Sequence, residues 1–161
     1  MKRNKKYNKE IPKETFMNGL RHIVLFITGA LLFASPPEWV DDPGSYEFSA
    51  TLSGGIVLSD GFNMADDGDM FGAFDEDGNV RGVAVQLTPS FGPYEEEIVY
   101  EMTLRSNAAG DILSFQFYYS SEDAILSISE TYEFVINEQL GHLVTGAVFF
   151  NVGFEDLSCP A

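Results

Sequence analysis

From Tyr46 onward, apolar and polar residues alternate along the chain with a period of two. In residues 46–52, Tyr, Phe, Ala and Leu alternate with Glu, Ser and Thr, and the same pattern recurs in residues 98–105, 113–119 and 131–136. A period of two places successive side chains on opposite faces of a β-strand, whereas a helix repeats every 3.6 residues. The pattern therefore predicts strands with one face in a core and the other in solvent.

Turn-forming residues separate these runs. The segments SGG, LSDG, SFGP, NAAGD and SSED are rich in Gly, Pro, Asn, Asp and Ser, which commonly end strands. Successive strands of this kind predict an all-β domain over residues 44–153, folded as an antiparallel β-sandwich of jelly-roll or immunoglobulin-like type. A last run, residues 147–152, is apolar on both faces, which predicts a central or covered strand.

The first 35 residues have a different composition. Seven of the nine Lys and Arg lie in the first 21 residues, and an apolar stretch of 12 follows at 23–34. This stretch is shorter than the ~20 residues that a membrane-spanning helix needs, but it suits the apolar region of a signal peptide. We interpret residues 1–35 as a signal-peptide helix with a long basic start, and residues 36–43 as a linker. A start at Met17 and an uncleaved membrane anchor are the alternatives.

The remaining chain is strongly acidic. From Ser35 onward it holds 23 Asp and Glu, against Arg81 and Arg105 as its only Lys or Arg residues. Such a surface repels nucleic acid and anionic lipid, so we expect no nucleic-acid partner and no membrane contact beyond the export signal. The single cysteine, Cys159, excludes a disulfide framework within this chain. We interpret residues 154–161 as the start of a following module, and the protein as secreted or cell-surface.

The stretch DDGDMFGAFDEDGNVRG, residues 66–82, has two interpretations. In the first, it is a β-hairpin with acidic turns, and Gly78 supplies the positive φ that an Asp-Gly turn requires. In the second, loop carboxylates bind calcium, which prefers six to eight oxygen ligands. The spacing does not match an EF-hand. The candidate calcium ligands are Asp60, Asp66, Asp67 and Asp69.

Three residues of the hairpin are expected to have structural roles, namely Gly78, Arg81 and Gly82. A partly buried arginine requires an acidic partner. We expect Arg81 to pair with Asp69 across the hairpin.

The same residues resemble an accessory β-sandwich module of secreted multi-modular bacterial surface proteins. That pattern is an aromatic opening strand followed by a DGD hairpin ending in RGVA. The matching residues are Trp39, Tyr46, Phe48, Ala50, Thr51, Gly68, Asp69, Ala73, Phe74, Gly78, Arg81, Gly82, Val83 and Ala84. The resemblance implies that the other domains of the same polypeptide are its partners. The final SCPA is similar to the opening of a hyalin-type repeat.

The sequence offers no set of residues for catalysis. The G-x-S-x-G and HExxH motifs and phosphate-binding glycine loops are absent, and His142 is the only histidine outside the signal region. We therefore expect no enzyme activity. Tyr118 and Tyr94 are candidate ligand-binding residues, because exposed rings beside acidic groups suit a sugar. The expected function is binding or adhesion, to an extracellular polysaccharide or a surface protein. The alternative is a structural spacer or protein-interaction module without a small-molecule ligand.

Overall fold

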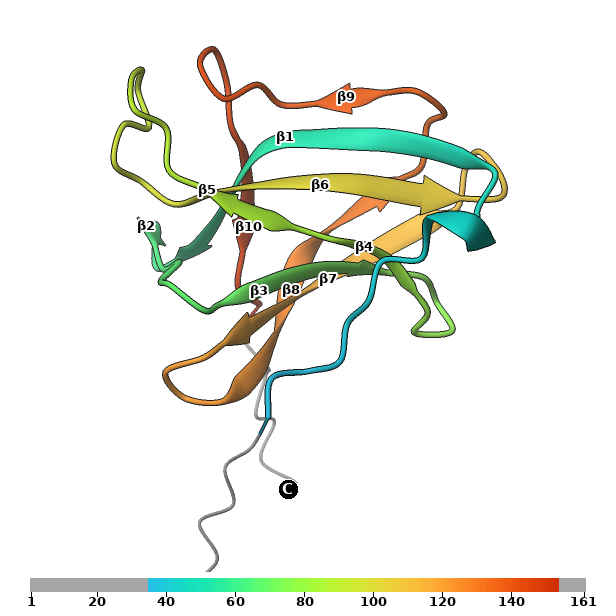
Figure 1. Ribbon diagram of the computed structural model, residues 1–161, viewed down its shortest axis with the longest axis horizontal. Coiled ribbons are helices and arrows are strands. Elements are labelled where there is room, and N and C mark those ends of the chain that lie inside the picture. The colour runs from blue at the N-terminus through green and yellow to red at the C-terminus, as the bar shows by residue number, and fades with distance from the viewer. Residues whose placement is uncertain (1–34, 154–161) are drawn as a thin grey trace, which may run out of the picture. The chain divides into compact units, whose positions relative to one another are not determined.

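The computed structural model describes residues 35–153 (Figure 1). A 3-10 turn, η1 (Pro43–Ser45), is followed by ten strands and by no α-helix within this range. The strands are β1 (Phe48–Ser59), β2 (Phe62–Asn63), β3 (Met70–Phe74), β4 (Val80–Val83), β5 (Val85–Leu87), β6 (Val99–Ser106), β7 (Ile112–Tyr119), β8 (Ala124–Glu133), β9 (Gln139–Leu140) and β10 (Val148–Asn151).

Two predicted segments fall outside the described residues. The signal-peptide helix was placed in residues 1–35, of which only Ser35 is described, and the start of a following module was placed in residues 154–161. Residues 35–153 contain no helix of the length and apolarity that a membrane crossing requires.

The strands form two sheets, as the alternating pattern predicted. One sheet has the order β10-β1-β6-β5, with the short strands β2 and β9 also paired to β1. The other has the order β4-β3-β7-β8. The all-β sandwich is therefore confirmed. Neighbours are antiparallel except for β10 and β9, which run parallel to β1. A residue period of two is common to both orientations, so the sequence pattern carried no information about these two pairings.

The core between the sheets is built largely from aromatic rings. Phe71 of β3 is fully buried, and its ring centroid lies 5.4 Å from that of Tyr100, 5.6 Å from Phe115 and 4.9 Å from Phe150. Burying one such side chain stabilises a fold by about 1.5–3 kcal/mol. Because Tyr100 and Phe150 belong to one sheet and Phe71 and Phe115 to the other, these contacts join the two layers.

The last strand does not occupy the central position that its apolar sequence suggested. β10 lies at the edge of its sheet and pairs only with β1. Phe150 points into the core, whereas Phe149 is 48% exposed. The strand is held at its end by an isolated bridge between Val152 and Ile128 of β8, on the other sheet. Burial in the core therefore explains the apolar residues on the inward face of β10 and not those on its outward face.

The segment before β1 covers the outer face of β3. Trp39 packs its ring edge-on against Phe74, with the centroids 5.1 Å apart. Gly72 leaves the space for this ring, since a Cβ there would lie 3.1 Å from a Trp39 ring carbon. The residues expected to form a linker are therefore packed on the sandwich (Figure 1, blue).

Gly82 lies where the two sheets come together at one edge. The chain passes directly from β4 in one sheet to β5 in the other, and β4 also lies against β6. A Cβ at Gly82 would be 2.6 Å from the carbonyl oxygen of Thr103 and 2.9 Å from Met102. No side chain fits there without moving the backbone of β6. The structural role expected for Gly82 thus has a steric cause.

Replacing Gly82 by alanine should destabilise the protein strongly, by about 3 kcal/mol, because the overlap is with backbone atoms. Gly78→Ala is the matched control. Gly78 has φ +81° and nothing within 4 Å of an added Cβ, so the cost is only that of the left-handed conformation, about 1 kcal/mol. Urea unfolding of both variants measures the difference. Equal losses of stability in the two variants would show that β4 and β6 can move apart to accept a Cβ at position 82.

Candidate functional site

The acidic stretch contains two turns, and these lie at opposite ends of β3. Asp66 to Asp69 form a turn before β3, and Asp75 to Asn79 form the turn between β3 and β4. In the second turn the Gly78 amide donates to the Asp75 carbonyl at 3.1 Å. The Asp75 carboxylate accepts from the backbone amides of Asp77 at 3.0 Å and Asn79 at 2.8 Å. These contacts support the turn interpretation of this half of the stretch.

Asp69 is the one buried carboxylate of the stretch, with 4% exposure. One of its oxygens accepts from the Asp66 amide at 2.8 Å. The other accepts from the backbone amide and from the hydroxyl of Ser120, each at 2.8 Å. A buried carboxylate is stable when donors surround it in this way. Asp69 therefore ties the turn before β3 to the end of β7.

Gln86 holds the same turn from the opposite sheet. Its side-chain amide donates to the carbonyls of Asp66 at 2.7 Å and Asp69 at 3.2 Å. It also lies 3.2 Å from the Tyr100 hydroxyl. Burial raises the pKa of Tyr100, so this phenol stays neutral and acts as a hydrogen-bonding group. Sequence analysis missed Gln86, because a single glutamine in a strand gives no signal of such a contact.

The carboxylates proposed as calcium ligands are not gathered into one site. Asp60 is exposed at the tip between β1 and β2, and Asp66 and Asp67 are exposed in the turn before β3. Within residues 35–153, no three acidic, His or Cys side chains are arranged to hold a metal ion. The donors around Asp69 already satisfy it without an ion. The described residues thus do not fit a preformed calcium site, and calcium binding stays a prediction.

Arg81 pairs with Asp75 and not with Asp69. Its guanidinium donates to one Asp75 oxygen from Nε at 3.0 Å and from Nη2 at 2.9 Å, and both side chains are largely buried. It also lies over the ring of Tyr46, 4.5 Å from the centroid. The expected partner was wrong because Asp69 lies at the far end of β3, about 17 Å away for five residues. The structural role of Arg81 is supported, with a different carboxylate.

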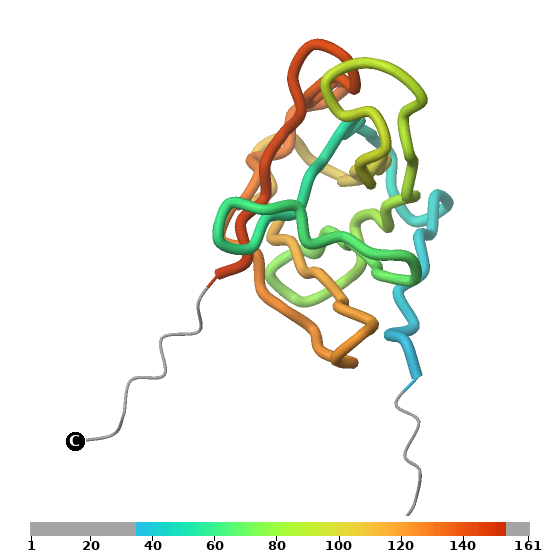
Figure 2. Tube along the Cα trace, turned by 90° about the vertical axis from the view of Figure 1, so that its left-hand side faces the viewer, coloured from blue at the N-terminus to red at the C-terminus, as the bar shows by residue number. Residues whose placement is uncertain are grey.

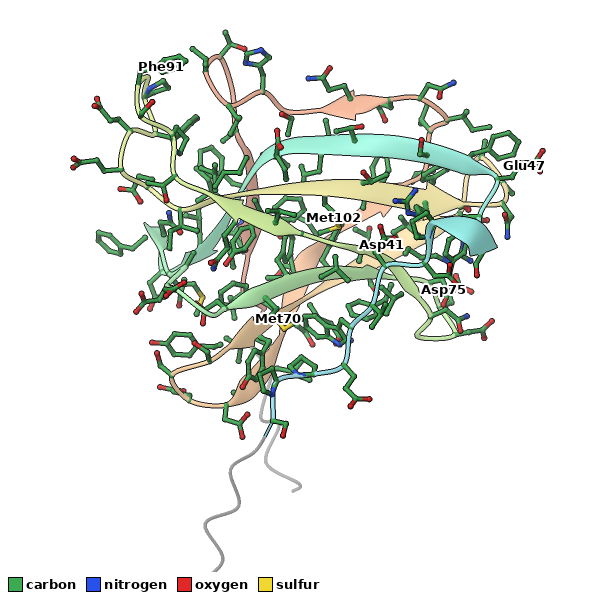
Figure 3. All side chains as sticks on the ribbon, viewed as in Figure 1. Asp41, Glu47, Met70, Asp75, Phe91 and Met102 are labelled. Atoms are coloured by element: carbon green, nitrogen blue, oxygen red, sulfur yellow. The ribbon has the colours of Figure 1, made fainter. Side chains whose placement is uncertain are left out.

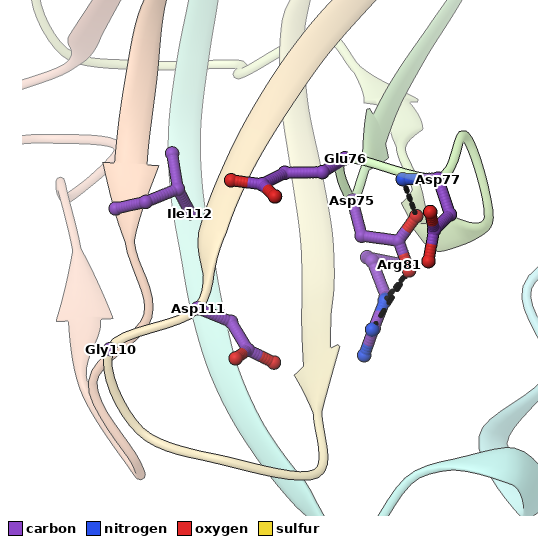
Figure 4. A pocket seen from close by; sticks show the side chains of 7 residues that line it. All are labelled: Asp75, Glu76, Asp77, Arg81, Gly110, Asp111 and Ile112. Carbon is purple, nitrogen blue, oxygen red and sulfur yellow. Dashed lines mark hydrogen bonds and ion pairs between the residues drawn. The ribbon is translucent and has the colours of Figure 1, made fainter.

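A shallow cavity lies beside this ion pair (Figure 4). Its volume is about 310 Å³, and the turns between β3 and β4 and between β6 and β7 form its walls. Glu76, Asp77 and Asp111 contribute carboxylates, and Ile112 contributes an apolar wall. Asp111 accepts a hydrogen bond from the buried Ser106 hydroxyl. The Arg81–Asp75 pair is internally neutralised, so the free charge of the cavity is negative.

Tyr118 and Tyr94 do not form an exposed binding surface. Tyr118 points away from the core, as expected, but it is only 5% exposed, and its hydroxyl donates to Asp123 at 2.9 Å. This hydrogen bond, together with burial, raises the pKa of Tyr118. The Tyr94 hydroxyl accepts from the Ala147 amide at 3.1 Å, so this ring joins two loops. For Tyr118, outward orientation in a strand did not mean exposure, because the ring lies against the turn that contains Asp123.

The exposed aromatic side chains are phenylalanines in other places. Phe62 in β2 is 77% exposed, and Phe91 in the loop between β5 and β6 is 65% exposed. Figure 3 shows Phe91 at the tip of its loop, far from Asp75 at the other end of the sandwich. Sequence analysis did not single out Phe91, although its turn-forming SFGP context favours a surface loop.

Comparison of the chain with protein-family models, with curated proteins and with solved structures gives no match.

The stability that Asp75 contributes should depend on pH. Burial acts to raise the pKa of Asp75, but hydrogen bonds from Asn79 and Arg81 outweigh it, and the net pKa is below the ordinary 3.8. A lowered folded-state pKa means that the contribution is complete above pH ~4 and is lost as pH falls through the folded-state pKa. The free energy of unfolding should therefore fall less between pH 4 and pH 2 for Asp75→Asn than for the wild type, because the variant has no carboxylate at this position to protonate.

The measurement is chemical unfolding at several pH values, with Asp77→Asn as control. Asp77 is an exposed neighbour in the same turn, so its variant should follow the wild-type profile. If the profile of Asp75→Asn is also parallel to that of the wild type, the buried ion pair does not contribute as described.

Asp69→Asn should destabilise the protein by about 2 kcal/mol, because the new amide would put a donor against one of the N–H or O–H groups that Asp69 accepts. The loss should be equal in EDTA and in millimolar calcium. Asp67→Ala, at an exposed position, is the control and should melt like the wild type. A calcium-specific rise in the wild-type melting temperature that magnesium does not give and that Asp67→Ala abolishes would instead establish a metal loop.

Proposed function

We propose that the chain is a non-catalytic, extracellular β-sandwich module of a larger exported protein, and that it acts in binding or adhesion. The positions of residues 35 and 153, between which the structure describes the chain, carry this proposal. The coloured chain begins and ends in the lower half of Figures 1 and 2, whereas the loop of residues 88–98 and that of residues 141–147 form the top. Neighbouring segments would thus attach on one side, and the loops would stay free on the other.

The surroundings of His142 support a non-catalytic role. Its Nδ1 accepts a hydrogen bond from the Val144 amide at 3.1 Å, and its backbone exchanges hydrogen bonds with Gly146 at 2.8 and 3.1 Å. The imidazole thereby stabilises the turn that contains it. This hydrogen bond uses Nδ1 as the acceptor, which leaves the proton on Nε2, and no side chain of the described residues hydrogen-bonds to Nε2 as a catalytic partner would.

A protein partner is favoured over a carbohydrate by the positions of the tyrosines. Every tyrosine in residues 35–153 is buried or half-buried. Five of their hydroxyls have hydrogen-bond partners, namely those of Tyr46, Tyr94, Tyr100, Tyr118 and Tyr132. The exposed rings belong to phenylalanine, which packs against apolar groups and offers no hydrogen bond to a sugar hydroxyl. An exposed phenylalanine offers a partner protein apolar contact area, and a binding surface needs further apolar groups beside it.

The proposal is tested by exposing the purified full-length chain to two probes, a random-peptide phage library and a glycan array. Both are run in calcium and in EDTA. We expect a family of related peptides to be enriched and the array to stay negative. Binding to a glycan only would support adhesion to polysaccharide instead. Failure of both probes would favour the structural spacer and contradict a binding role.

A further inference from the structure

We propose that the loop between β5 and β6, residues 88–98, docks a basic segment of a partner protein. Phe91 and Val144 would receive an apolar side chain of that segment, and Glu95, Glu96 and Glu97 would attract its Lys and Arg residues. The inference rests on the binding function proposed above and identifies the surface and the chemistry of the partner.

The exposure of Phe91 is a property of an ordered loop. The loop folds back on itself through backbone hydrogen bonds from Glu95 to Gly92 at 3.3 Å, from Glu96 to Pro89 at 3.1 Å and from Glu97 to Tyr94 at 3.1 Å. The loop nevertheless leaves Phe91 65% exposed. Because these hydrogen bonds already fix the backbone of the loop, docking of Phe91 does not have to order the loop.

Two further contacts fix the loop on the sandwich. The Asn63 side chain donates to the Glu97 carboxylate at 2.8 Å and to the Ile98 carbonyl at 3.0 Å. Tyr94 accepts from Ala147 of the neighbouring loop. Glu96 is held at φ +66°, a conformation that residues other than glycine rarely adopt. Strain of this kind persists only where the surroundings impose it.

The neighbouring loop completes the apolar surface. A Cβ at Gly92 would lie 3.9 Å from Cγ1 of Val144, so the two loops are in contact beside Phe91. Val144 is itself 39% exposed. Figure 2 shows the two loops side by side at the top of the molecule. The two loops thus meet at Gly92, the residue next to Phe91, and each loop carries an exposed apolar side chain, Phe91 in one and Val144 in the other.

The charge around this surface selects a basic partner. Glu95, Glu96 and Glu97 are all exposed, and the loop contains no Lys or Arg. The two arginines of residues 35–153 are paired with other carboxylates, Arg81 with Asp75 and Arg105 with Asp41. The glutamates are therefore not neutralised within the domain. Anionic lipid and nucleic acid are repelled, whereas a Lys- or Arg-containing segment is attracted.

The experiment uses the peptides enriched by the random-peptide phage library on the full-length chain. We expect them to combine Lys or Arg with an apolar residue. Phe91→Ser should weaken their binding by about tenfold or more, as truncation of a central aromatic residue does. Val85→Ser is the matched control, because Val85 is 63% exposed in β5, and it should bind like the wild type. All variants should keep the wild-type melting temperature.

A second pair of variants tests the charge. The double variant Glu95→Gln/Glu96→Gln should weaken binding several-fold, and raising the salt from about 0.1 M to about 1 M should weaken wild-type binding in the same way. Glu76→Gln/Asp77→Asn removes the same charge from exposed positions at the other end of the sandwich and should have little effect.

The possible failures are distinguishable. Peptides that bind Phe91→Ser as well as the wild type, or that lack Lys and Arg, would overturn this inference and leave the proposed binding function intact. Equal losses in both charge variants would show that only the overall negative charge matters, and would also overturn it. If no peptide is enriched, the inference fails together with binding to proteins.

Discussion

The packing of Phe71 between the two sheets is the contact on which the other features depend. Its ring meets Tyr100 and Phe150 of one sheet and Phe115 of the other, and this fixes β3 in the middle of the sandwich. β3 in turn places Asp69 directly before its first residue and Asp75 directly after its last. The five-residue strand therefore determines which carboxylates can act together, because it separates two groups that are close in sequence.

Each aspartate of this hairpin that is largely buried is used to hold the fold. Asp69 accepts hydrogen bonds from the backbone amides of Asp66 and Ser120. Asp75 accepts hydrogen bonds from the Arg81 guanidinium and from the amides of its own turn. In a chain with so few cations, backbone amides supply much of the compensation that a buried carboxylate needs. In the loop of residues 88–98, in contrast, the exposed carboxylates have no arginine beside them, because both arginines of residues 35–153 pair with aspartates outside this loop. The surplus negative charge is thus placed at the surface, where it can act on other molecules.

The distribution of aromatic side chains separates structural residues from candidate contact residues. The tyrosines with partners for their hydroxyl groups join segments, as Tyr94 joins two loops and Tyr118 joins β7 to the following turn. Phe91 and Phe62 remain outside. A tyrosine can satisfy its hydroxyl while its ring is covered, so it is useful where loops cross the outer face of a sheet. An exposed phenylalanine has no hydroxyl to satisfy in this way, and Phe91 therefore stands out as a candidate contact residue.

The sequence alone determined the all-β fold, the inward-facing residues of the strands and the Asp-Gly turn, because each depends on a local period or a local backbone preference. It did not determine that Trp39 covers β3, that Arg81 pairs with Asp75, or that Tyr118 is buried while Phe91 is exposed. These features depend on which segments lie over the outer faces of the sheets and on distances between residues remote in sequence. Only the tertiary structure decides them, since an alternating pattern states which face a side chain occupies and not what covers that face.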